Sequence, residues 1–205
     1  MTNPDIVEIV AIVDSSGSMQ SIKGAAIAGF NALLYDQQTL MNAADAIFTL
    51  VFFNSVHYMV YDAVDIGEVK PLTPNTYECD GNTAMYDAIG DTITRVHNKF
   101  KDMPEDEIPG TILFVIITDG GENDSHNYKG SLLKEMITRL KREDNWMFSY
   151  LSSTNNPYDE AEQIGIPNED VLKLRTGAQG MQEGYVKIST AYSNYRTGKS
   201  KKVNL

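Results

Sequence analysis

The sequence has little of several features that mark common classes of protein. Cysteine occurs once, as Cys79, so the fold cannot contain an internal disulfide bond. Basic residues are outnumbered, with 17 Lys and Arg against 28 Asp and Glu, and the formal net charge is −11. Such an excess of negative charge disfavours binding to a nucleic-acid backbone, but it would not repel a divalent cation.

Long hydrophobic runs are also missing from the sequence. The longest uncharged apolar run is about eight residues, whereas a membrane-spanning helix needs roughly 20. No basic segment precedes the first apolar run, and Glu8 interrupts that run, so no signal peptide is visible. Together with the single cysteine, these features predict a cytoplasmic protein without a membrane partner.

The chain has the length and composition of one globular domain. It has 205 residues, of which 42% are hydrophobic and 22% are charged, which suits a single core and argues against disorder. We expect a core over about 6–195 and a basic tail at 196–205. The apolar patterns predict strands at 6–13, 46–53, 57–64, 111–118, 146–152 and 170–174. They predict helices at roughly 20–41, 85–100, 132–140, 156–165 and 181–192.

This alternation predicts an α/β fold with a mostly parallel, doubly wound sheet and helices on both faces. The connection between 46–53 and 57–64 is too short for a parallel crossover, so these two strands should form an antiparallel hairpin. The segment 57–64 is the most polar of the six strands. We therefore expect it at an edge of the sheet.

Carboxylates and hydroxyls follow two of the predicted strands. Asp14 ends the first strand and Asp119 ends the most apolar one, while Ser16 and Ser18 follow Asp14 at alternating positions. In sheets of this type, ligands bind beyond the carboxyl ends of the strands. Two carboxylates about 6 Å apart repel by about 3 kcal/mol at an effective dielectric constant near 20. No Lys, Arg or His is within three positions of either aspartate, so a bound cation would neutralise them, Mg²⁺ first and Mn²⁺ or Ca²⁺ as alternatives.

Three segments resemble the motifs of von Willebrand factor A domains. They are the DxSxS signature at Asp14–Ser18, the loop "GNTAMYDAI" at 81–89 with Thr83, and the acidic element Asp119-Gly120. The resemblance covers about residues 6–195, and the wording of the motifs is nearest to that of stand-alone bacterial and phage-encoded members.

The resemblance implies a Rossmann-like six-stranded sheet in the order 3-2-1-4-5-6, with strand 3 antiparallel at the edge. It also implies a complete metal-ion-dependent adhesion site, in which an Asp or Glu of a partner protein completes the coordination of the metal. The ligand positions carried over are Asp14, Ser16, Ser18, Thr83 and Asp119. The predicted function is therefore a metal-dependent protein-binding module and not an enzyme.

Several other interpretations of these residues compete with metal binding. Asp14, Ser16 and Ser18 could cap the first helix, and Thr73 and Thr76 are alternatives to Thr83. Asp87 and Asp91 also resemble metal ligands, since they lie one helical turn apart. With Arg95 a further turn on, they are more readily explained as a solvated and salt-bridged helix face.

Two other functions are also open at the level of the sequence. The first is a phosphohydrolase or phosphotransferase with Asp14 as nucleophile, although such enzymes usually carry a second acid where this chain has Ser16. The second is a structural subunit whose metal site is unoccupied.

Overall fold

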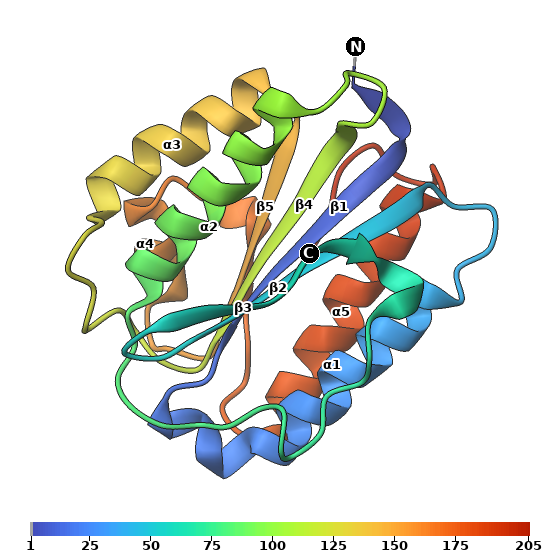
Figure 1. Ribbon diagram of the computed structural model, residues 1–205. Coiled ribbons are helices and arrows are strands. Elements are labelled where there is room, and N and C mark those ends of the chain that lie inside the picture. Colours follow the sequence, from blue (N-terminus) through green and yellow to red (C-terminus); the bar gives the residue numbers. More distant parts are fainter. Residues whose placement is uncertain (1) are drawn as a thin grey trace.

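A computed structural model describes residues 2–205, in which one β-sheet lies between two layers of helices (Figure 1). The strands are β1 (Asn3–Asp14), β2 (Asp45–Phe53), β3 (His57–Asp65), β4 (Pro109–Thr118), β5 (Trp146–Ser152) and β6 (Val171–Lys173). The α-helices are α1 (Lys23–Gln38), α2 (Met85–Lys99), α3 (Gly130–Glu143), α4 (Pro157–Gln163) and α5 (Ala178–Arg196). No helix within residues 2–205 combines the length and apolar character needed to cross a bilayer.

The six strands are arranged in the order β3-β2-β1-β4-β5-β6, which confirms the predicted topology. β1 pairs in parallel with both β2 and β4, and Ile9 lies opposite Phe48 on one side and Leu113 on the other. Only β3 runs antiparallel, paired with β2 at the edge of the sheet. The polar character of β3 therefore did indicate its edge position.

The two faces of the sheet are covered by different helices, as Figure 1 shows. Alternate residues of β1, including Ile9 and Val13, contribute to the core beneath α1 and α5. Val10 and Ile12 contribute to the second core, beneath α2, α3 and α4. Because both faces are covered, the middle of β1 is apolar on both sides except at Glu8, and it lacks the alternating pattern of a half-exposed strand.

The helix predicted at 20–41 is shorter and begins differently. The chain first forms a 3₁₀ turn at Gly17–Ile22, in which the Met19 N–H donates to the Ser16 carbonyl at 3.1 Å, and α1 follows at Lys23–Gln38. The tighter turn begins inside the Asp14–Ser18 motif. Helical periodicity predicts the apolar face correctly here, but it does not distinguish the tight turn from the helix that follows.

The last helix extends to Arg196, which the sequence analysis placed in a basic tail. The Arg196 side chain donates to the backbone carbonyls of Gln37 and Ala44, each at 2.8 Å, and the residue is buried. Val203 is buried as well. Part of the segment 196–205 therefore packs against the domain.

Candidate metal centre

The predicted acidic residues lie at the carboxyl ends of two neighbouring strands. Asp14 is the last residue of β1, and Asp119 directly follows β4. Val13 is paired with Ile117 across these strands, so the two strands end at the same level. From here β1 leads to β2 on one side, and β4 leads to β5 on the other. This is the switch point at which open α/β sheets bind ligands.

Asp14 is fully buried, and both of its carboxylate oxygens accept hydrogen bonds. Oδ1 accepts the Ser16 N–H at 2.7 Å, and Oδ2 accepts the Thr118 hydroxyl at 2.5 Å. Burial raises the pKa of Asp14 above its ordinary value, although these two hydrogen bonds act in the opposite direction. A nearby positive charge would stabilise the ionised carboxylate.

The two serines of the motif connect Asp14 to Asp119. The Ser16 and Ser18 hydroxyl oxygens are 3.1 Å apart, and the Ser18 hydroxyl donates to Asp119 Oδ1 at 2.5 Å. Ser15 points elsewhere, because its hydroxyl donates to a backbone carbonyl of β2 at 3.0 Å. The motif thus places two of its three hydroxyls beside the carboxylates and uses the third to attach the loop to the sheet.

Thr83 reaches the same space from a different loop. The Gly17 N–H donates to the Gly81 carbonyl at 3.0 Å, which ties the Thr83 loop to the serine motif. A Cβ atom placed on Gly120 would lie 3.6 Å from Thr83 Oγ1 and 3.8 Å from Ser18 Oγ. These two hydroxyls and Asp119 therefore border one small space, which a side chain at position 120 would partly fill.

The chemistry of this space suits a hard divalent cation. The candidate ligands are two carboxylates and three hydroxyls, so every candidate ligand atom is an oxygen. Burial raises the pKa of Asp119, despite the hydrogen bond from Ser18. Within residues 2–205, neither Asp14 nor Asp119 forms an ion pair with a basic side chain. The same residues contain no group of three or more His, Cys, Asp or Glu side chains placed to hold a metal, so a metal site here depends on hydroxyl ligands.

The prediction of a solvated face for Asp87 is wrong. Asp87 is only 6% exposed, and its carboxylate accepts the backbone N–H groups of residues 126–128 at 2.8 to 2.9 Å. Although burial opposes its charge, these hydrogen bonds hold the pKa of Asp87 below its ordinary value. Asp91 and Arg95 do lie on an accessible face, but each pairs with a residue of β3.

The alternative threonines lie apart from Thr83, and two further residues contact Asp14. Thr73 and Thr76 are exposed and pair with each other, with their hydroxyl oxygens 3.2 Å apart. Sequence reasoning missed Thr118, although its position directly before Asp119 was a usable signal. It also missed Tyr77, whose buried hydroxyl donates to the backbone carbonyl of Asp14. No sequence pattern indicates that contact.

Comparisons with known proteins find solved structures of similar fold, but no match to a family model or to a curated protein sequence. No protein-family model matches the chain, and no curated protein matches it. Among solved structures, proximal thread matrix protein 1 from the mussel byssus, with a zinc-occupied MIDAS motif, is 13% identical with a TM-score of 0.61. The alignment covers 94% of this chain and 46% of the mussel protein.

Two further solved structures have similar sequence identities and TM-scores. A von Willebrand factor type A protein from Catenulispora acidiphila is 17% identical, with a TM-score of 0.58, over 94% of this chain and 43% of its own. The pilus adhesin SpaC from Lactobacillus rhamnosus GG is 12% identical, with a TM-score of 0.67, over 95% of this chain and 31% of its own. This chain thus spans less than half the length of each of the three proteins. At these identities the likeness concerns the fold, and the chain has the fold of von Willebrand factor A domains.

Proposed function

We propose that this protein is a metal-dependent protein-binding module. Its site would hold a divalent cation, Mg²⁺ with Mn²⁺ or Ca²⁺ as alternatives, and an Asp or Glu of a partner protein would complete the coordination. One observation carries the proposal, namely the hydrogen-bonded chain of Ser16, Ser18 and Asp119 beside the buried Asp14. The proposed metal ligands are Asp14, Ser16, Ser18, Thr83 and Asp119.

The mixture of ligands favours an external acidic group. Only two of the five candidate ligands are carboxylates, and the three hydroxyls are neutral. When bound, a divalent cation would supply an electron-poor centre that attracts a further carboxylate. Thr118 and the Ser16 N–H hold the two oxygens of Asp14 in place, which fixes the orientation of this carboxylate at the end of β1.

The arrangement supports binding rather than catalysis. An aspartyl nucleophile needs an accessible oxygen, whereas Asp14 is fully buried and both of its oxygens accept hydrogen bonds. The position two residues on is Ser16, which cannot act as an acid or base in the manner of a second carboxylate. The mussel protein with zinc in its MIDAS motif and the pilus adhesin share this fold, in agreement with a binding role.

Calorimetric titration with Mg²⁺ and Mn²⁺ tests the metal site. We expect wild type to bind one ion and Asp14→Ala to bind none. Asp91→Ala is the matched control, because it removes an acid that is paired with His57 on β3. Equal heats from wild type and Asp14→Ala would contradict the proposal.

The partner carboxylate is tested separately. Short peptides that differ only by Asp or Asn are added to the Mn²⁺-loaded protein, and the water-proton relaxation of the bound Mn²⁺ is followed. We expect the Asp peptide alone to displace a bound water and lower the relaxivity. Identical responses to both peptides would refute this part of the proposal.

A further inference from the structure

The loop between β4 and α3 contacts the backbone of Thr83, and Asn123 makes those contacts. We propose that Asn123 is a positioning residue, which sets the place of the Thr83 hydroxyl at the metal centre. The inference rests on the proposed metal site. It concerns a residue outside the five candidate ligands.

Asn123 binds the main chain of Thr83 from both sides. Its side-chain Oδ1 accepts the Thr83 N–H at 2.9 Å, and its own backbone N–H donates to the Thr83 carbonyl at 3.0 Å. Thr83 is 3% exposed, so both of its main-chain polar groups need such partners. With the backbone held at both groups, the point from which the Thr83 side chain projects is set relative to Asp119, which lies four residues before Asn123.

The adjacent Glu122 fixes Asn123 in turn. Glu122 Oε2 accepts the N–H of Tyr86 in the first turn of α2 at 2.8 Å. Its Oε1 accepts the N–H groups of Asp124 and Ser125 at 2.9 and 2.7 Å. Glu122 is therefore occupied by backbone donors, and it connects the loop to the helix that begins just after Thr83.

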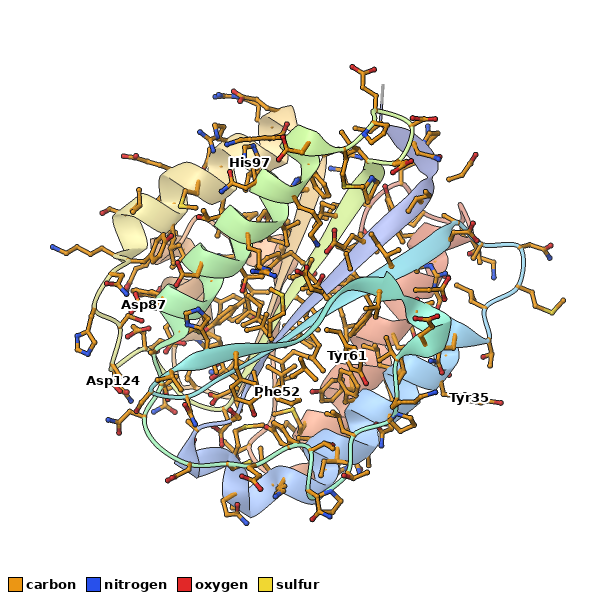
Figure 2. All side chains as sticks on the ribbon, in the orientation of Figure 1. Tyr35, Phe52, Tyr61, Asp87, His97 and Asp124 are labelled. Atoms are coloured by element: carbon orange, nitrogen blue, oxygen red, sulfur yellow. The ribbon has the colours of Figure 1, made fainter. Side chains whose placement is uncertain are left out.

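Asp87 provides a second connection from the helix to the same loop. Figure 2 shows Asp87, on α2, beside the loop that carries Asp124. The Asp87 carboxylate accepts the N–H groups of residues 126–128. Each segment thus contributes one carboxylate to the backbone of the other, and Asn123 lies where this doubly attached loop contacts Thr83.

The chemistry of the contact requires an acceptor at the end of a two-carbon side chain. Aspartate retains Oδ1 and can accept the Thr83 N–H. Leucine has a similar size but cannot accept it, which leaves a buried N–H without a partner. Substituting residues that orient a metal ligand typically weakens metal binding by about 10- to 100-fold. The position of one hydroxyl should therefore depend on which side chain stands at 123.

The test compares Asn123→Leu, Asn123→Asp, Thr83→Ala and wild type. Mn²⁺ affinity is measured by calorimetry, and the number of waters on bound Mn²⁺ is measured by proton relaxation. We expect Asn123→Leu to bind Mn²⁺ about tenfold more weakly and to carry an additional water, as Thr83→Ala should. Asn123→Asp should bind at least as tightly as wild type. Asn168→Leu, which replaces an exposed amide in the segment before β6, is the matched control and should behave as wild type.

Two results would overturn the inference. One is wild-type affinity and relaxivity in Asn123→Leu while Thr83→Ala is impaired. The other is an equal loss of affinity in Asn123→Asp and Asn123→Leu. Because Asn123→Asp retains the acceptor for the Thr83 N–H, such a loss in this variant would overturn the inference even if the leucine variant folds poorly. Failure of wild type itself to bind Mn²⁺ would instead refute the proposed function, so the two failures can be told apart.

Discussion

Replacing Lys99 by methionine should destabilise the protein through Glu8, a carboxylate within the sheet. Glu8 is 0% exposed, and its Oε1 accepts the Thr49 hydroxyl at 2.6 Å and lies 3.6 Å from Lys99 Nζ. Its Oε2 has no hydrogen-bond partner among the described residues. Burial raises the pKa of Glu8, and the charge of Lys99 is the largest influence that lowers it. Lys99 is therefore the main group that stabilises the ionised form of Glu8.

The expected loss follows from the geometry of this pair. Breaking a buried ion pair by removing one partner costs about 3–5 kcal/mol. Lys99 is 24% exposed and also lies 2.7 Å from Asp62, so we expect the lower end, about 3 kcal/mol at pH 7. In a domain of this size, each kcal/mol lowers the melting temperature by about 2–4 °C. The predicted decrease is therefore about 6–12 °C.

The loss should depend on pH in a defined direction. The pKa of Glu8 in the folded state is raised above its ordinary value of 4.5, and removing Lys99 raises it further. Between the ordinary pKa of 4.5 and the raised pKa of the folded state, the folded state binds more protons than the unfolded state. In this range the free energy of unfolding therefore falls as the pH rises. The deficit of Lys99→Met relative to wild type should therefore shrink as the pH is lowered from 7 toward 5.

Urea unfolding at pH 7 and pH 5 measures both effects. Arg95→Met is the control, because Arg95 is 61% exposed and pairs with Asp62 at the surface, where such pairs contribute less than about 1 kcal/mol. The double variant Glu8→Gln/Lys99→Met should recover most of the loss. A cost no larger than that of Arg95→Met, or a larger cost at pH 5 than at pH 7, would refute the reasoning.

Two further predictions concern packing and the loop after β4. A Cβ on Gly29 would lie 2.3 Å from Tyr185 Cδ2 at the contact of α1 with α5, so Gly29→Ala should lower stability by about 1–3 kcal/mol. Gly24→Ala, with nothing within 4 Å, should not, and similar melting temperatures for both would contradict this. Asp87→Asn should cost about 2 kcal/mol at pH 7, because it weakens charge-assisted hydrogen bonds from residues 126–128. Since the pKa of Asp87 is lowered from 3.8, its contribution is lost as the pH falls below that value, and a pH-independent difference in urea unfolding would contradict the assignment.

The sequence allowed the architecture to be predicted because each strand has a distinct apolar pattern. The near-continuous apolar run of β1 follows from its burial on both faces, and the mixed polarity of β3 follows from its edge position. The short connection after Phe53 determines the antiparallel pairing. The first residue of α1 was less predictable, because the 3₁₀ turn at Gly17–Ile22 has nearly the same apolar spacing as an α-helix.

The candidate site was predictable where its residues follow strand ends or belong to a compact motif. Asp14 and Asp119 are placed by the ends of β1 and β4, and Ser16 and Ser18 are placed by their spacing from Asp14. The partners Tyr77 and Asn123 were missed, because each acts through a contact with the backbone of a residue far away in the sequence. Asp87 was misjudged for the same reason, since helical periodicity does not indicate which loop packs across a helix.

The most direct test of the metal centre is anomalous diffraction from crystals grown with Mn²⁺. We predict a single anomalous peak at the carboxyl ends of β1 and β4, within bonding distance of the hydroxyl oxygens of Ser16, Ser18 and Thr83, and absent from crystals of Asp14→Ala. A peak elsewhere on the molecule, or an empty site at saturating Mn²⁺, would contradict the account.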